Sequence, residues 1–315
     1  IACAIGCFIF AASDSLYLAQ TGRLISGIGS AFAFVGTLRL ATYWFPPHKI
    51  GLIAGMTQAA GMLGASVGEG PFAMIVKVIG WRQTMGLIGL IILTIGILIM
   101  LLVRDKPSEK GFIGEDIKSG PGIWECFKEV IKNPQSWYNG IFVGLLYSPT
   151  AAFAELWGVP FLTETYNMST EVAATGISAI FLGWAIGGPI TGWISDKQGK
   201  RKPTMALSAL LSVITLSMIL YIPNLSTTSL FILLFLYGIT NTGVATSYAL
   251  SSEINKTEVS GTSIAFANMA SVIIGSGFQP IIGKILDNTW DGTMINGVPV
   301  YSISSYHSAL YLLPL

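Results

Sequence analysis

The chain has 315 residues, of which 52% are hydrophobic and only 10% are charged, and its formal net charge is +1. A typical soluble domain carries about 25% charged residues, so this composition excludes an ordinary water-soluble globular protein. Its near-zero net charge gives no reason to expect a nucleic-acid partner. Long apolar segments recur along the chain, and about 20 apolar residues in a helix cross the hydrocarbon core of a bilayer. The sequence therefore predicts an all-α polytopic membrane protein.

The apolar segments follow one another in chain order. The first part is predicted to hold the remainder of one span and three whole spans, at residues 1–13, 15–45, 50–79 and 83–103. The later part is predicted to hold five whole spans and the start of another, at residues 137–162, 172–195, 204–222, 230–251, 262–286 and 305–315. A polar loop, residues 288–304, precedes the last of them.

A charged segment broken by prolines and glycines, residues 104–136, separates the two groups of spans. It predicts a linker between an N-terminal half, residues 1–103, and a C-terminal half, residues 137–315. Lys and Arg gather on the cytoplasmic side of membrane proteins. The basic loops are therefore predicted to be cytoplasmic, and they are the linker, Lys49, residues 197–202 and Lys256.

The linker itself contains a short helical pattern. Ile123, Phe127 and Ile131 are spaced by four residues, which places them on one face of a helix. Two interpretations stay open, because such a helix either lies in the membrane interface or is a solvated part of the linker.

A weak internal repeat relates the two groups of spans. Gln58 lies 210 positions before Asn268, and Glu69 lies 210 positions before Gln279. The two residues of each half are eleven apart, about three helical turns, so both face one side of their helix. We interpret this as a duplicated fold with a shared polar lining rather than a coincidence of spacing. We expect the intact protein to have twelve spans in two pseudo-symmetric six-helix halves, of which this sequence covers about spans 3 to 12.

One cytoplasmic loop carries a pattern of the form G-x-x-x-D-[RK]-x-G-[RK]-[RK]. Its residues are Gly192, Asp196, Lys197, Gly199, Lys200 and Arg201. This pattern resembles the signature loop of the major facilitator superfamily in its second-half copy. Arg23 and Gly27 are similar to that superfamily's fourth-span motif, and Gly64 to Pro71 resembles a loose form of its glycine-proline motif. The full glycine spacing known from drug/proton antiporters is absent.

The resemblance implies the fold of that superfamily and solute transport by alternating access. It also implies that the loop is a latch holding a cytoplasmic gate shut, with Asp196 paired to Lys or Arg. Ordinary positive-inside charge is the alternative, and it explains the cations but not Asp196, Gly192 and Gly199.

Two charged residues fall inside predicted spans. Arg23 lies about eight residues, or about 12 Å, inside its span, and Glu69 lies about ten residues, or about 15 Å, from the outer end of the next. Intramembrane charges are costly unless they are paired or wetted, so we expect Arg23 and Glu69 to pair or to share a polar cavity. Either Glu69 takes up the proton that drives transport, or the pair is purely structural.

Other polar residues inside the spans are candidates for a solute or proton pathway. They are Gln58, Asn139, Tyr147, Glu155, Asn241, Tyr248, Asn268 and Gln279. Amide and phenol groups orient polar solutes without a buried charge. Hydrogen bonding between helices is the alternative for each of them.

These features predict a secondary active transporter, a symporter that takes up a small polar solute with protons. The solute is an amino acid, an organic anion or a sugar phosphate. A drug/proton antiporter is the alternative, followed by a receptor or polytopic enzyme that does not transport. His48 and His307 are isolated and no catalytic motif is present, so we expect no enzyme activity, cofactor or metal. We expect a monomer with several spans in the plasma membrane, the bacterial inner membrane.

Overall fold

The computed structural model describes the backbone of residues 1–44, 47–104, 122–295 and 298–314. The chain divides into two compact units. Unit 1 comprises Ile1–Gly61 and Pro71–Lys118, and unit 2 comprises Met62–Gly70 and Ser119–Leu315. The predicted division at residues 104–136 stays a prediction.

Unit 1 is built from helices α1 (Ala2–Ala11), α2 (Leu16–Trp44), α4 (Trp81–Leu102) and most of α3 (Pro47–Ile79). Helix α1 packs against both α2 and α4. The C-terminal ends of α2 and α4 are joined, because the Trp44 indole N–H donates to the carbonyl of Arg104 at 3.0 Å. Gly80 has a φ of 82°, a left-handed conformation that glycine adopts freely, and it turns the chain from α3 into α4.

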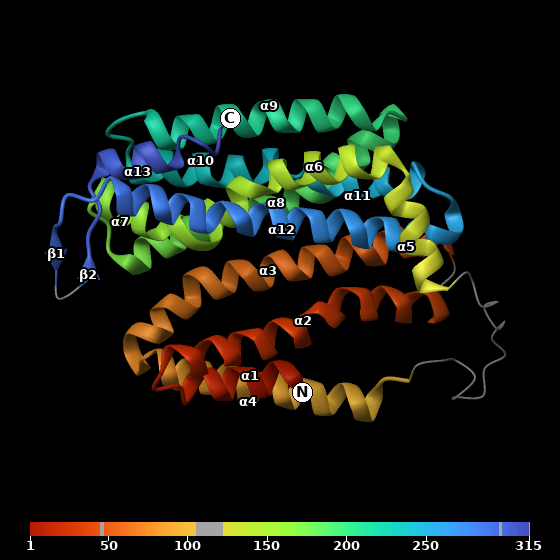
Figure 1. Cartoon of the computed structure of the whole chain (residues 1–315), viewed down its shortest axis with the longest axis horizontal. Helices are drawn as coiled ribbons and strands as arrows, with labels where there is room; N and C mark the ends of the chain where they lie inside the picture. The colour runs from red at the N-terminus through yellow and green to blue at the C-terminus, as the bar shows by residue number, and fades with distance from the viewer. Residues whose placement is uncertain (45–46, 105–121, 296–297, 315) are drawn as a thin grey trace. The chain divides into compact units, whose positions relative to one another are not determined.

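Unit 2 contains the remaining elements, and Figure 1 shows their order. They are α5 (Ile123–Lys132), α6 (Pro134–Pro149), a π-helical segment η2 (Thr150–Trp157), α7 (Gly158–Tyr166), α8 (Thr170–Gln198), α9 (Arg201–Tyr221), α10 (Thr227–Thr240), α11 (Gly243–Glu253), a 3-10 turn η3 (Thr257–Val259), α12 (Ser260–Asn288), strands β1 (Met294–Ile295) and β2 (Val298–Pro299), and α13 (Ile303–Leu310). Helices α6 and α12 lie side by side, as do α8 and α10. The strands form one short antiparallel pair.

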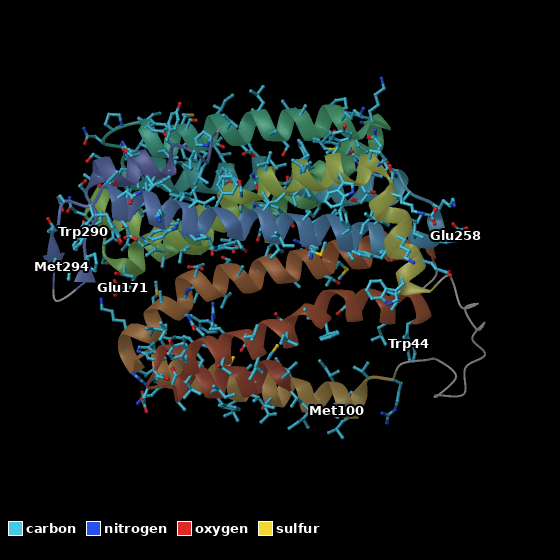
Figure 2. All side chains as sticks on the ribbon, in the orientation of Figure 1. Trp44, Met100, Glu171, Glu258, Trp290 and Met294 are labelled. Carbon is cyan, nitrogen blue, oxygen red and sulfur yellow. The ribbon has the colours of Figure 1, made fainter. Side chains whose placement is uncertain are left out.

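Six helical segments in the described part of the chain are long and apolar enough to cross a membrane. They are Met56–Ile79, Trp81–Leu102, Thr170–Gln198, Arg201–Tyr221, Thr227–Glu253 and Ser260–Asn288. In unit 2 the loops between them gather at two opposite ends. Glu171, Trp290 and Met294 lie at one end and Glu258 at the other (Figure 2). The chain is therefore a membrane protein with several spans.

The span predicted at residues 230–251 is broken in the structure, because α10 ends at Thr240 and α11 begins at Gly243. The Ser208 hydroxyl of α9 bridges the break, since it donates to the carbonyl of Thr240 and accepts from the N–H of Gly243. Backbone groups inside a membrane need partners wherever a helix is interrupted. A side chain from a neighbouring helix supplies them here, so the sequence of the span itself did not reveal the break.

Helices α8 and α10 approach each other backbone to backbone. A Cβ atom added at Gly183 would overlap the carbonyl oxygen of Phe235, and one added at Gly238 would overlap that of Ile180. The two glycines face each other, because the Cβ on Gly183 would lie 3.0 Å from the Cα of Gly238. Small residues permit this close packing inside membranes.

The linker helix α5 packs against the rest of unit 2. Cys126 and Val130 are buried against Val259 and Phe266, with Phe127 and Ile131 packed at the edge. Ile123 is 83% exposed, so it does not belong to the buried face. The structure has a helix at the residues where the spacing of four indicated one, and Cys126 and Val130 form the centre of its packed side.

An ion pair and hydrogen bonds reinforce this attachment. Lys256 Nζ lies 2.7 Å from Glu129 Oε1, and this hydrogen bond raises the pKa of the Lys256 amine. The Asn133 amide donates to Asn255 Oδ1 at 2.9 Å, just after the helix ends. In Figure 1, α5 crosses the end of α12 instead of running along it.

Candidate functional site

The loop between α8 and α9, which is predicted to be cytoplasmic, contains a cluster of ionic contacts. Arg201 Nη1 lies 2.5 Å from Asp196 Oδ1, and its Nη2 lies 2.6 Å from Glu253 Oε1. Arg201 Nη1 also donates to Ser195 Oγ at 3.0 Å. One guanidinium therefore joins the end of α8 to the end of α11. The structure shows Asp196 paired with a cation as expected, while its role as a latch stays a prediction.

The other residues of the loop motif have distinct positions. Gly199 ends α8 with a φ of 62°, a conformation that an L side chain rarely adopts. Lys200 precedes the first residue of α9, and the Lys197 amine lies 5.0 Å above the Trp193 ring. A Cβ atom at Gly192 would meet no atom within 4 Å, so packing in unit 2 does not explain this glycine.

Glu253 completes the ionic cluster and was not predicted from the sequence. The sequence did contain an indication of this role, because Glu253 is an isolated acid close to the predicted cytoplasmic end of the span at residues 230–251. Only the packing of α11 beside α8 and α9 brings that acid to Arg201.

A second polar cluster lies within unit 2 around Tyr147 and Glu155. The Tyr147 hydroxyl donates to Glu155 Oε1 at 2.5 Å. Pro149 lacks a backbone N–H, and the π-helical segment after it has wider turns than an α-helix. This geometry places the Glu155 carboxylate next to the Tyr147 hydroxyl, although Tyr147 lies eight residues earlier in the chain. Such π-helical insertions often occur at functional sites.

Aromatic and amide groups surround this pair. The Trp184 ring packs edge-on against the Tyr147 ring, with centroids 6.2 Å apart. Trp184 is 3% exposed, and its indole N–H has no hydrogen-bond partner among the described residues. The Gln279 amide donates to the carbonyl of Ala151 at 2.9 Å, and the Trp157 indole donates to the carbonyl of Gln279 at 3.2 Å.

Glu69 belongs to the same unit through the segment Met62–Gly70. Ser66, on this segment, donates to the carbonyl of Ser178 at 3.1 Å. The half-buried Glu69 carboxylate is close enough to Glu155 for their charges to repel. Two predicted pathway residues from different spans are thus brought together.

Arg23 lies in unit 1, on α2. Its guanidinium carbon is 5.7 Å from the centre of the Phe10 ring, and it lines an open groove with Gln20 and Leu24. Gln58, also in unit 1, is half-buried on α3. Arg23 and Glu69 fall in different units, so their expected pairing stays a prediction.

Asn139 and Asn241 are fully enclosed in hydrogen-bond networks. Asn241 accepts from Thr150 Oγ1 at 3.0 Å and donates to the carbonyl of Leu146 at 2.9 Å. Asn139 exchanges hydrogen bonds with Ser247, 2.9 Å and 2.6 Å long. These contacts match the alternative of bonding between helices.

Tyr248 and Asn268 form a further contact at the edge of unit 2. The Tyr248 hydroxyl donates to Asn268 Oδ1 at 3.1 Å and lies 3.2 Å from Ser271 Oγ. Tyr237 lies in the core, where its hydroxyl is 3.2 Å from Thr150 Oγ1, the group that also donates to Asn241.

Comparison with known proteins decides the class. The family model described as Major Facilitator Superfamily matches residues 1–280. The chain belongs to this superfamily. The predicted fold is therefore confirmed, and so is the predicted class, a membrane solute transporter rather than an enzyme.

Individual relatives of this superfamily member are distant. It is 25% identical to "Membrane sensor protein UhpC" of Escherichia coli, over 97% of this chain and 73% of that protein. It is 23% identical to the "Probable hexose phosphate transport protein" of Chlamydia muridarum, over 65% of this chain and 56% of that protein. A solved bacterial homologue of the human lysosomal transporter Spinster has a TM-score of 0.73, at 17% identity, over 99% of this chain and 77% of that structure. The last comparison supports the fold alone.

Proposed function

We propose that this superfamily member takes up a small hydroxylated organic anion of the sugar-phosphate class. It works by alternating access, is driven by protons, and acts as a monomer in the bacterial inner membrane. The observation that carries this proposal is the cluster around Tyr147 and Glu155, where a phenol donates to an exposed carboxylate and the Gln279 amide lies against the same π-helical segment, bonded to the carbonyl of Ala151. The name of the Chlamydia relative supplies the solute class.

The two parts of such a solute need different partners. Sugar hydroxyls pair well with carboxylate and amide groups and pack against aromatic rings, which Glu155, Gln279 and Trp157 provide. A phosphate or carboxylate group needs a cation, and Arg23 is a fork-shaped donor placed within a predicted span. We assign Arg23 to the anionic end of the solute.

The ionic cluster of Arg201, Asp196 and Glu253 supports the alternating-access part of the proposal. It joins helix ends at the cytoplasmic side, where the loops carry the positive charge. Contacts of this kind form in one state of a transporter and break in the other, so they control which state is populated.

Two other functions have an observation in their favour. The description of the E. coli relative as a membrane sensor favours binding without transport. The neighbouring carboxylates of Glu69 and Glu155 favour a cationic solute and efflux. Both remain outcomes of the experiment that follows.

Uptake by purified protein in liposomes separates the three functions. We expect accumulation of labelled glucose 6-phosphate when the lumen is made alkaline, and little uptake of a neutral hexose or an apolar cation. Binding of the sugar phosphate without uptake would indicate a sensor. Exchange of a cation for protons, with no sugar-phosphate uptake, would identify the antiporter.

Replacement of Arg23 by glutamine tests its assignment to the anionic end. Loss of a charge-assisted hydrogen bond costs about 1.5–3 kcal/mol, so we expect the apparent affinity for glucose 6-phosphate to fall about tenfold to 100-fold. Arg23→Lys retains the charge but not the two-pronged geometry, so its affinity should be intermediate. Equal affinities in the wild type and Arg23→Gln, measured by competition in the uptake assay, contradict the assignment.

A further inference from the structure

We propose that Glu155, held by the Tyr147 hydroxyl, is the group that takes up and releases the transported proton, and that its neutralisation admits the anionic solute. This inference rests on the proposed function and gives it a coupling site. It moves the main proton role from Glu69, the predicted candidate, to the carboxylate with the more exposed position.

The position of Glu155 supports this assignment. Glu155 is exposed, whereas the residues directly before it, Ala151 to Ala154, are buried with exposures of 2% or less. A carboxylate within a span normally faces a polar cavity rather than lipid. It is thus accessible to water and solute while its backbone is fixed in the core of unit 2.

The neighbours of Glu155 provide the second argument, because they hold it without neutralising its charge. Tyr147 of α6 donates one hydrogen bond, and Glu69 of α3 adds a like charge. Tyr237 of α10 and Tyr248 of α11 are the other titratable groups near Tyr147. Glu155 forms no ion pair with a described residue. Helix α12, which packs against η2, presents the uncharged Gln279 at the cluster, while its Lys284 is exposed further along the helix.

The unpartnered indole of Trp184 is the third argument. A buried N–H without a hydrogen bond costs about 1–3 kcal/mol, and proteins rarely retain one without a use. It lies beside Tyr147, the residue that donates to Glu155, and we assign it as a donor to a solute oxygen.

These groups describe a proton-dependent site. While Glu155 is ionised, its charge and that of Glu69 repel an anion. Proton uptake forms one O–H bond on the Glu155 carboxyl, whose other oxygen still accepts from Tyr147. The new O–H and the Trp184 N–H then both donate to the solute. Release of the solute allows the proton to leave and restores the carboxylate, so one proton accompanies each solute.

A proton fits this site better than a metal cation. Sodium or a divalent ion needs several oxygen ligands, whereas Glu155 has one phenol that already donates to it. No group of three or more His, Cys, Asp or Glu residues that would hold a metal exists among the described residues.

The test compares proton-driven accumulation with exchange. Liposomes containing wild-type protein or Glu155→Gln receive labelled glucose 6-phosphate with the membrane potential clamped, either with an alkaline lumen or with unlabelled solute inside at equal pH. A gradient of one pH unit sustains about tenfold accumulation at one proton per solute. We expect Glu155→Gln to lose this accumulation, while exchange, which needs no net movement of protons, stays measurable at a reduced rate because Glu155 also contacts the solute. Glu258→Gln, the same change at an exposed loop position, should behave as the wild type.

Intrinsic tryptophan fluorescence provides a readout that needs no transported solute. Ionisation of Glu155 should change the emission of Trp184 or Trp157, so the wild type should show a pH titration that Glu155→Gln lacks. Tyr147→Phe should shift the midpoint of this titration, because the ionised carboxylate loses its donor. A titration that persists in folded Glu155→Gln, or proton-driven accumulation by that variant, overturns the inference. If the wild type titrates through Glu155 but transports no sugar phosphate, only the proposed function fails.

Discussion

Replacement of Gly183 by valine is expected to prevent assembly of the C-terminal helices. The new Cβ would overlap the carbonyl of Phe235 and crowd Gly238, so α8 and α10 would have to separate along their contact. Overpacking costs about 1–3 kcal/mol where side chains give way and more where backbones must move, which is comparable to the whole stability of many proteins. Size-exclusion chromatography in detergent should show little or no monodisperse protein.

The same helix offers a control. A Cβ at Gly188 would meet nothing within 4 Å, so Gly188→Val adds the same volume without a clash. This variant should elute as the wild type and melt within about 3 °C of it. If Gly183→Val and Gly188→Val are equally well folded, the close contact between α8 and α10 does not support the fold.

Removal of the Arg201 side chain is expected to reduce uptake strongly while leaving the protein folded. Arg201→Ala leaves the carboxylates of Asp196 and Glu253 close together without a cation. Their side chains are 69% and 48% exposed, so solvent screens them, and we expect a change of about 1–2 kcal/mol in the balance between transport states. Uptake should fall about tenfold, and Arg201→Lys should recover part of it.

Lys202 serves as the control, because it is exposed and forms no ion pair with the residues that the structure describes. Lys202→Ala removes one positive charge from the same loop and should leave initial uptake rates near those of the wild type. The double variant Asp196→Asn/Glu253→Gln should lose the latch as Arg201→Ala does. Wild-type rates in Arg201→Ala would show that these contacts do not control transport.

Hydropathy predicted the helices well because lipid imposes long apolar segments. The span expected at residues 83–103 is observed as Trp81–Leu102, and the one expected at 204–222 as Arg201–Tyr221. The interruptions were not predicted, since they depend on contacts between helices. Ser208 sustains the break after Thr240 from a neighbouring helix, and the π-helical segment has no hydropathy signature of its own.

The residues of the candidate site could be predicted one by one from the sequence, but the contacts between them could not. Tyr147 and Glu155 were identified as polar residues in one span, yet an α-helix does not align residues eight apart as the π-helical turns do. Asn139 and Asn241 had the same sequence signal as Gln279, because an amide in a span serves a solute or a neighbouring helix equally well. Only the structure shows the two asparagines enclosed.

The break between α10 and α11 divides this span into two helices connected by a joint. The first helix, α10, packs against α8 at Gly238. The second helix, α11, carries Glu253, which belongs to the ionic cluster. The Ser208 hydroxyl bonds to the carbonyl of Thr240 and to the N–H of Gly243 at this joint. Rotation at the joint would therefore strain these two hydrogen bonds and would not need to unwind a helical turn. We therefore expect α11 to rotate relative to α10 when the contacts of Arg201 with Asp196 and Glu253 break.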